Sequence, residues 1–420
     1  MNRAEELAAL NALEIPSALE GTVERAKKRR AGRRLRLGIP LSSLAGAAAA
    51  FVILVNVSVP FALACGQIPI LKDLVLAASG NESLKAALES DYYQILNQEY
   101  TENGITLKLY CMVADAHQVN VFLSLSAGHG CLRGVSAADG GELGMSWSAS
   151  LDDPGARPWE PQYFTVDFAG AAAPRSFTIR YDIYEDADWS WEDEPLASFR
   201  VPLTLNQTSL DSARAVELGT RFELDGQILT LERVILSPTH TQIDLSGQEG
   251  NTAWLTGLTF QLEDEQGNVY DTVHNGISSF GDPGDSSPFA AHYRIQSTYF
   301  SQAEHLTLRI SSARWLDKDC PEMVLDTRTR TAENLPEYVK SWEAQREGTG
   351  WNFDFEVEET GGSFPFFDPS GYGNHTGTGY YQREGSTHTY LTLEDCDETC
   401  FRFPLYYNRA TGEDTALPLF

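Results

Sequence analysis

The chain has 420 residues, 31 Lys/Arg, 59 Asp/Glu and a formal net charge of −28. This length predicts two to four domains, and the acidic balance disfavours nucleic acid and anionic polymers as partners. The charge is unevenly divided: residues 1–36 carry nine Lys/Arg against five Asp/Glu, a net of +4, so the remainder, with 22 against 54, has a net charge of −32.

Residues 1–36 form a basic tail with the pattern of two short helices. Apolar residues recur at helical spacing before Pro16, and Ser17 with Glu20 matches a capping box that starts a second helix. The tail has too few apolar side chains for a core of its own. It is therefore either a leader for the following segment or an amphipathic segment that folds on a cytoplasmic partner. The residues expected to contact such a partner are Leu7, Leu10, Leu13, Ile15, Leu19 and Val23.

The segment after the tail has the composition of a transmembrane helix. Residues 37–71 contain no charged side chain. The apolar run 37–59 makes about 35 Å of helix, enough to cross the ~30 Å hydrocarbon core. Pro60 ends the run, so we predict a membrane span over residues 37–62. The alternative is a cleaved signal peptide, but a polar region of 36 residues before the apolar run is too long for one.

The charge next to the span predicts its orientation. Basic residues gather on its N-terminal side and are sparse after Val59. The positive-inside rule therefore places the N-terminus in the cytoplasm and the C-terminal bulk of the chain outside the cell membrane. The basic residues expected at the membrane interface, where they contact anionic lipid, are Arg29, Arg30, Arg33, Arg34 and Arg36.

The exterior begins with a helical segment and continues as β-strands. Apolar residues in 65–90 have helical spacing, interrupted at Gly80-Asn81. From residue 92 onward, alternating residues between Gly, Pro and Asp turns predict antiparallel strands packed as sandwiches. The expected domains are 66–205, a helical lead-in with a β-sandwich; 206–320, a second β domain; and 321–420, a third β region or the completion of the second.

Three hairpins are predicted from their turns. The first joins strands 105–113 and 119–126, the second turns at Asp225-Gly226, and the third turns at Gln266-Gly267-Asn268. The stretch 361–382 is rich in glycine and aromatic residues. We predict that it forms a long loop.

No motif points to catalysis or to a cofactor. The eight histidines are scattered, and the sequence has neither a G-x-S-x-G elbow nor an H-E-x-x-H motif. Carboxylates are abundant, but nothing singles out a glycosidase pair. The acidic stretch 184–194 lacks the spacing of a Ca²⁺ loop and is better explained as a solvated hairpin tip. We therefore expect no enzyme, no cofactor and no metal site.

Two further groups of side chains are candidates for a role. Cys396 and Cys400 are close enough in the sequence for a local disulfide, and the exterior is a compartment where disulfides persist. Exposed aromatic residues stack on sugars in many binding proteins, although the cores and rims of sandwiches also use them. The aromatic candidates are Trp189, Trp191, Tyr372, Tyr380 and Tyr381.

Several stretches together resemble a family of single-pass membrane proteins from Gram-positive bacteria. They are IPSALEGTVERAKKRR, the apolar run, IPILKDLV, and LNQEYTENGITLKLYCMVADAHQVNVFLSL with its NGIT pattern and its turn at Asp115. ELGTRFELDGQILTLERVILSPTHTQIDL, with its DGQ and SPT patterns, resembles the immunoglobulin-like domain that often follows. The match covers residues 15–126 and 206–320. The ectodomain of this family is a domain of unknown function.

The resemblance implies a function in signalling. Members are commonly regarded as regulators of extracytoplasmic-function sigma factors, so the tail would hold a sigma factor while the exterior senses the envelope. This tail lacks the His and Cys residues of zinc-containing anti-sigma domains. From the resemblance and the apolar run, we expect a mainly β, membrane-anchored, anti-sigma-like regulator with immunoglobulin-like domains outside. The alternative is an anchored surface binding module for cell-wall glycan or protein, in which the tail is dispensable.

Overall fold

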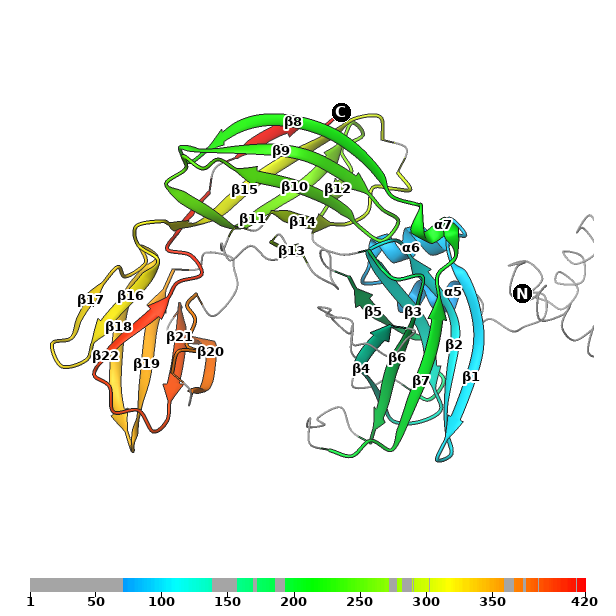
Figure 1. Cartoon of the computed structure of the whole chain (residues 1–420), viewed down its shortest axis with the longest axis horizontal. Coiled ribbons are helices and arrows are strands. Elements are labelled where there is room, and N and C mark those ends of the chain that lie inside the picture. Colours follow the sequence, from blue (N-terminus) through cyan, green and yellow to red (C-terminus); the bar gives the residue numbers. More distant parts are fainter. Residues whose placement is uncertain are drawn as a thin grey trace, which may run out of the picture. The chain divides into compact units, whose positions relative to one another are not determined.

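The computed structural model describes residues 71–137, 157–168, 172–185, 193–271, 278–281, 289, 291–301, 303–358, 366–372, 375–383, 385–412 and 414–420 (Figure 1). The predicted tail helices, the predicted span and the predicted sigma-factor contacts all lie outside these residues. Within the part of the chain that is described, no helix combines the length and apolarity needed to cross a membrane.

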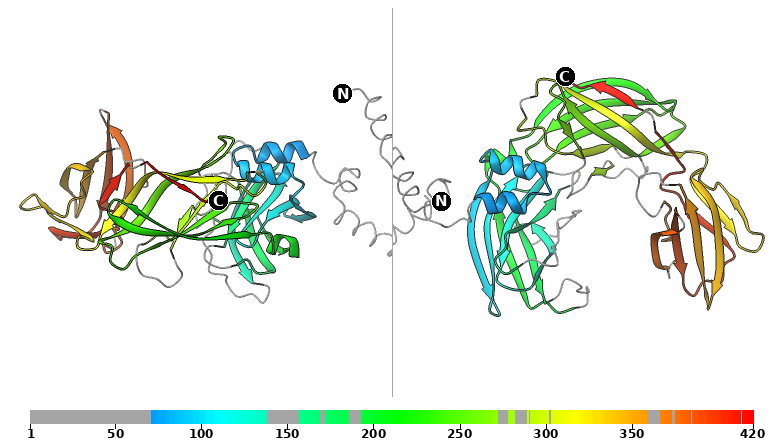
Figure 2. Two further views of the ribbon diagram at one scale, coloured as in Figure 1. Left: turned by 90° about the horizontal axis from the view of Figure 1, so that it is seen from above. Right: turned by 180° about the vertical axis from the view of Figure 1, so that it is seen from behind.

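The first unit confirms the predicted β class and packs two antiparallel sheets around one core (Figure 2). The predicted first hairpin is present, with Leu107 opposite Leu125 and Ala114 opposite Val119. One sheet contains β1 (Gln94–Glu102), β2 (Ile105–Ala114), β3 (Gln118–Leu125) and β5 (Gln162–Asp167); the other contains β4 (His129–Ala137), β6 (Ser176–Tyr184) and β7 (Ala197–Thr204).

Two short helices, α5 (Leu71–Ala77) and α6 (Glu82–Glu89), pack on the outer face of the first sheet, as the helical spacing predicts. Asn81 caps α6, because its side chain accepts a hydrogen bond from the Leu84 N–H at 3.1 Å. Helical leucines pack against Phe122 of β3. Since the other face of β3 contributes to the core between the sheets, this strand is buried along its whole length.

The second unit has two five-stranded sheets around a second core. The predicted hairpins at Asp225-Gly226 and Gln266-Gly267-Asn268 are both present. A short helix, α7 (Gln207–Leu210), precedes the unit. Its strands are β8 (Arg214–Leu224), β9 (Gln227–Leu236), β10 (Thr241–Gly247), β13 (Ser279–Phe280) and β14 (His292–Ile295) in one sheet, and β11 (Ala253–Asp264), β12 (Val269–Tyr270), β15 (Leu306–Asp317), β23 (Arg409–Thr411) and β24 (Thr415–Pro418) in the other.

The third region lies in the sequence between β15 and β23 and has its own core, which is rich in phenylalanine. Its chain leaves the second unit after β15 and returns to pair with it, since β23 and β24 are both hydrogen-bonded to β15. Its strands are β16 (Glu322–Asp326), β17 (Thr331–Glu333) and β22 (Cys400–Pro404) in one sheet, and β18 (Val339–Glu347), β19 (Gly350–Val357), β20 (His375–Arg383) and β21 (Ser386–Leu393) in the other.

The loop predicted over 361–382 is wrong in its last part, where β20 pairs with β21. The glycines there do not make turns. They leave room for an aromatic ring, because a Cβ at Gly379 would lie 2.8 Å from atoms of the Tyr390 ring. Earlier in the same stretch, Phe366 and Phe367 are buried in the third core.

A substitution at Gly350 tests the packing of the third region. A Cβ there would lie 1.9 Å from the carbonyl oxygen of Leu393, so Gly350→Ala should destabilise this region by roughly 1–3 kcal/mol or more. Hydrogen exchange of the β19 and β21 amides in the full chain measures the loss. Gly371→Ala, with no atom within 4 Å of its new Cβ, is the control; equal exchange in the two variants would contradict the packing.

Candidate functional site

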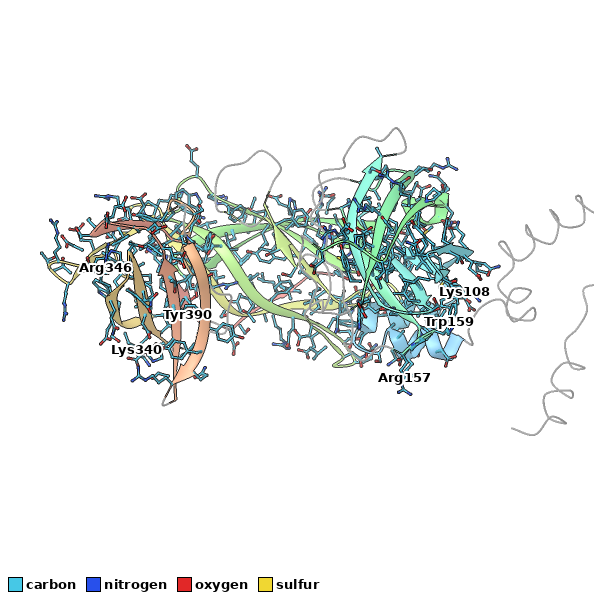
Figure 3. The ribbon with its side chains drawn as sticks, turned by 90° about the horizontal axis from the view of Figure 1, so that it is seen from below. Lys108, Arg157, Trp159, Lys340, Arg346 and Tyr390 are labelled. Carbon is cyan, nitrogen blue, oxygen red and sulfur yellow. The ribbon has the colours of Figure 1, made fainter. Side chains whose placement is uncertain are left out.

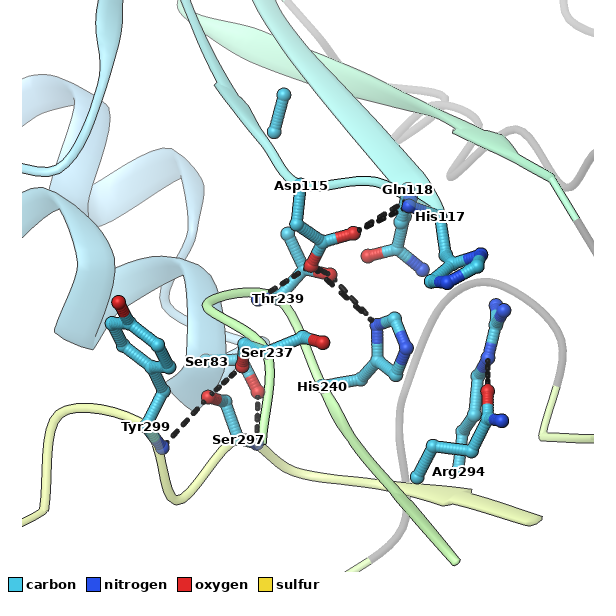
Figure 4. A network of polar contacts seen from close by, with 12 residues as sticks. Ser83, Asp115, His117, Gln118, Ser237, Thr239, His240, Arg294, Ser297 and Tyr299 are labelled. Atoms are coloured by element: carbon cyan, nitrogen blue, oxygen red, sulfur yellow. Dashed lines mark hydrogen bonds and ion pairs between the residues drawn. The ribbon is translucent and has the colours of Figure 1, made fainter. Parts of the chain in front are cut away.

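A buried polar network joins the first and second units (Figure 4). Asp115, in the turn between β2 and β3, is fully buried. Its Oδ1 accepts hydrogen bonds from the backbone N–H groups of His117 at 2.8 Å and Gln118 at 2.9 Å. The carboxylate therefore shapes its own turn. This leaves the other oxygen, Oδ2, for the second unit.

The second unit meets Asp115 with the turn between β9 and β10. The N–H of Ser237 donates to the carbonyl of His240 at 2.9 Å and closes this turn. Thr239 donates to Asp115 Oδ2 from its N–H at 3.2 Å and also from its hydroxyl. One carboxylate thus holds two hairpin turns that come from different units.

His240 completes this contact in its neutral form. Its Nδ1 lies 2.8 Å from Thr239 Oγ1 and 3.8 Å from Asp115 Oδ2. Because the threonine hydroxyl donates to Asp115, the imidazole must donate from Nδ1, which leaves Nε2 as a bare acceptor. That buried Nε2 has no hydrogen-bond partner among the described residues.

An ion pair buried in the same network links β5 to β14. Arg294 Nη1 lies 2.5 Å from Asp167 Oδ1, and the two side chains are 1% and 0% exposed. Asp167 Oδ2 accepts from Gln118 Nε2 at 3.1 Å. Arg294 Nε donates to Gln242 Oε1 at 3.3 Å, and its guanidinium lies 5.0 Å from the centre of the Phe280 ring. The charges are therefore held by neighbours from both units.

The helices of the first unit form the other side of the contact. Ser83 of α6 accepts from the Ser297 N–H at 2.8 Å, and the Ser297 hydroxyl donates to the Ser237 carbonyl at 2.6 Å. The Tyr92 ring lies 5.6 Å from the Phe300 ring, measured between centroids. A polar centre and an apolar edge together attach the second unit to the helices as well as to the sheet.

Burial sets the protonation state at the centre of the network. The pKa of His240 is lowered well below its ordinary value of 6.5, first by burial and next by the positive charge of Arg294. Asp167 opposes this shift, and His117 adds to it. His240 is consequently neutral at pH 7, which agrees with its hydrogen bonding.

This network positions two domains and is closed to substrates. Its charged and imidazole groups, Asp115, Asp167, His240 and Arg294, are at most 2% exposed. A general acid or base must reach the proton that it moves, and these groups reach only one another and neighbouring protein atoms. The arrangement therefore suits mechanical coupling between the units.

The cysteine pair predicted as a possible disulfide is not bridged, because Cys396 and Cys400 are free thiols. Cys396 lies in the third core and donates to Glu398 at 2.9 Å. Burial, followed by this hydrogen bond, raises the pKa of its thiol to about 11. Cys400 is exposed at the start of β22. One side chain is buried and the other is exposed, so their closeness in the sequence does not bring the two sulfur atoms together.

The other sequence-based candidates are separated in the structure. Tyr372 is half-buried against Phe401, and its hydroxyl accepts from the Arg402 N–H at 2.7 Å. Tyr380 and Tyr381 lie on β20. Trp189, Trp191 and the acidic residues 186–192 lie outside the described residues, as do the tail contacts and the interface arginines.

Sequence reasoning missed the ion pair and His240. Arg294 and Asp167 are 127 positions apart, and no local pattern links them. The sequence did contain a signal for the contact between the two turns. The Asp115 turn and the SPT pattern both carried the family resemblance, and these are the two turns that meet in the network. Asp115 has both uses, because one oxygen shapes its own turn and the other accepts from the second unit.

Comparison with known families matches two parts of the chain. Residues 39–127 match a family described as a domain of unknown function (DUF4179), and residues 214–340 match a family of unknown function (DUF5643). Curated protein sequences gave no match. Among solved structures, a conserved domain protein from Bacillus anthracis is similar, with 14% identity, coverage of 58% of this chain and 85% of that chain, and a TM-score of 0.34.

The two matched regions are the ones that the network brings together. Asp115 lies in the first match, and Thr239, His240 and Arg294 lie in the second. Asp167 belongs to neither. Each matched region therefore contributes a turn to a buried contact with the other.

The ion pair predicts a large effect of a single substitution. Arg294→Met leaves Asp167 charged and buried, and should lower the free energy of opening this contact by roughly 3–5 kcal/mol. Replacing both residues, Arg294→Met with Asp167→Leu, should cost less than the sum of the single changes. Hydrogen exchange of β10 and β14 in the full chain measures each value.

The control for that series is Arg309→Met. Arg309 pairs with Glu263 on the surface, where the side chains are 50% and 31% exposed, so its loss should cost less than about 1 kcal/mol. Equal losses for Arg294→Met and Arg309→Met would show that the buried pair does not hold the units together.

His240 predicts a pH dependence of the same contact. Its pKa is below 6.5 when buried, so opening lets it take up a proton once the pH falls below about 6.5. The stabilisation is complete above that pH and is lost towards lower pH, by up to about 1.4 kcal/mol per pH unit. Hydrogen exchange of β10 between pH 7 and 5, corrected for intrinsic rates, should follow this slope. His240→Gln should flatten it, whereas the exposed control His305→Gln should leave it unchanged.

Proposed function

We propose that this chain is a single-pass, membrane-anchored regulator of the anti-sigma-factor type. The tail lies in the cytoplasm, residues 37–62 cross the membrane, and the β units lie outside. The apolar stripe of the tail contacts an extracytoplasmic-function sigma factor. The protein acts by binding and release, and not as an enzyme. The contact residues are Leu7, Leu10, Leu13, Ile15, Leu19 and Val23.

The observation that carries this proposal is the extent of the first family match. It begins at residue 39, inside the uncharged run, and ends at residue 127, just after β3. One family unit therefore includes most of the predicted span, the helices α5 and α6, and the hairpin with Asp115. This continuity is expected when the state of the exterior must be transmitted to a membrane segment.

The buried network supports a route for that transmission. The helix α5 is the first described element after the predicted span, and it packs with α6 on the sheet that contains β2 and β3. The turn between these strands is held by the second unit through Asp115. A change that loosens the second unit thus alters the support of the helices nearest to the membrane.

We also propose that the second unit is an immunoglobulin-like domain. Residues 206–320 resemble an immunoglobulin-like domain, and the two sheets around one core are compatible with that architecture. In the proposed protein this unit senses the envelope or receives a protease, and the first unit relays its state.

The test uses the full chain in membranes of the source organism. The full chain is captured, and mass spectrometry identifies what is retained from the cytoplasm. The wild type should retain a sigma factor, and Leu19→Asp with Val23→Asp should lose it, because two charges would enter the apolar contact.

A matched control separates loss of contact from added charge. Gly21→Asp with Thr22→Asp adds the same two charges between the apolar positions and should retain the sigma factor. Retention by the Leu19/Val23 variant would refute the contact. A wild-type chain that captures no sigma factor would refute the regulatory proposal itself.

A further inference from the structure

The third region presents a polar and aromatic sheet face opposite its core. Residues alternate between buried and accessible along all of β21 and along β19 from Asn352 to Val357, so one face holds the phenylalanine core and the other meets solvent. Tyr390 lies on the solvent side of β21 (Figure 3) and is 38% exposed. The accessible face is therefore built by regular strands and not by loops.

The ring of Tyr390 lies over glycines of the neighbouring strand. Gly379 is directly opposite Tyr390 in the β20–β21 pairing. A Cβ at Gly379 would lie 2.8 Å from the ring, and one at Gly377 would lie 3.6 Å from it. Since no side chain stands between the ring and the strand, Tyr390 can lie down on the sheet and offer the opposite side of its ring to solvent.

A carboxylate with two fixed donors stands beside this ring. Asp354 of β19 is opposite Tyr390, accepts from the Tyr381 hydroxyl, and lies 2.7 Å from His388 Nδ1. The rings of Tyr381 and His388 are stacked, with centroids 5.1 Å apart. Asp354 is still 35% exposed. Its oxygens have lone pairs left for a ligand, and their direction is set in advance.

A second oriented carboxylate lies on the same face. Glu356 accepts from the hydroxyls of Ser386 at 2.8 Å and Ser341 at 3.1 Å. These two hydrogen bonds are the main cause of its lowered pKa. Glu356 is therefore ionised at neutral pH and is a fixed acceptor two residues along β19 from Asp354.

The charge of this face selects among ligands. Asp354, Glu356 and Glu343 alternate onto it through the β18–β19 pairing, against two cations: Lys340, whose charge acts on Glu356, and Arg383 at the β20 edge. An anionic polymer would be repelled. An aromatic ring beside oriented acceptors is instead suited to a ring-shaped ligand with an apolar face and several hydroxyl donors at its edge.

We propose that this face, centred on Tyr390 and Asp354, binds an uncharged oligosaccharide of pyranose rings. One sugar stacks its C–H face on Tyr390. Its hydroxyl groups donate to the carboxylates of Asp354 and Glu356. The binding does not depend on the tail or on a sigma factor, so it is tested separately from the regulatory function.

The experiment titrates the full chain in lipid nanodiscs with the hexamer of N-acetylglucosamine, followed by calorimetry. The wild type should bind, and Tyr390→Ala should raise Kd at least tenfold. Tyr390→Leu keeps an apolar side chain over the glycines but removes the aromatic ring, so it should weaken binding by a similar factor. Hydrogen exchange of β19 and β21 checks that each variant keeps the sheet.

The matched control is Tyr380→Ala. Tyr380 lies on β20, next to Gly379, and is 66% exposed. It pairs with the buried Thr389, so it is on the opposite face of the sheet from Tyr390. This variant should bind like the wild type. The proposal is overturned if the hexamer does not bind, if Tyr390→Ala and Tyr390→Leu bind normally, or if a poly(glycerol phosphate) chain binds more tightly than the sugar.

Discussion

The contact between the first two units depends on charges that water cannot reach. Arg294 and Asp167 are both buried, and a buried pair tolerates the loss of neither partner. Their positions are set by Gln118 on one side and Gln242 on the other, so the pair forms only when both units are folded. Opening such a junction breaks these contacts together, because each of them needs groups from both units. The proposed regulator would need this property to relay a change from the second unit to the first.

Carboxylates recur as organisers of turns throughout the described chain. Asp264 accepts from the N–H groups of Gln266 and Asn268 at 3.0 and 2.8 Å, and so shapes the β11–β12 turn. Asp225 accepts from Trp315 Nε1 at 2.6 Å and from the Thr411 hydroxyl. Part of the acidic composition is therefore structural, because Asp264 satisfies backbone N–H groups of its turn and Asp225 ties its turn to side chains of β15 and β23.

Local signals account for what the sequence predicted correctly. Asp225 and Gly226 have φ of 51° and 72°, and Gly267 has φ of 82°. Such positive angles favour Asn, Asp and Gly, which is why these hairpins were readable. Where the same residue types have another use, the prediction failed. Glycines under the Tyr390 ring resembled a loop, yet they belong to a strand.

Contacts between distant segments could not be predicted from a single sequence. Arg294 is one of many basic residues, and its partner Asp167 is one of many acidic ones. The strands β23 and β24 have only three and four residues, and both are paired with β15. The carboxylate face of the third region likewise depends on the register of four strands. Its members were visible as residue types, but their proximity was not.

The third region is an insertion whose two ends enter one sheet side by side. The chain leaves next to Trp315 of β15 and returns at Arg409 of β23, which is paired with it. Tension on the inserted region therefore pulls two neighbouring strands in the same direction. It reaches the rest of the sheet as shear along the ladder from Ala253 opposite Asp317 to Asp264 opposite Leu306. In shear the hydrogen bonds of a ladder must yield together, whereas peeling breaks them one by one. The insertion can thus bear load without unravelling the unit that holds it.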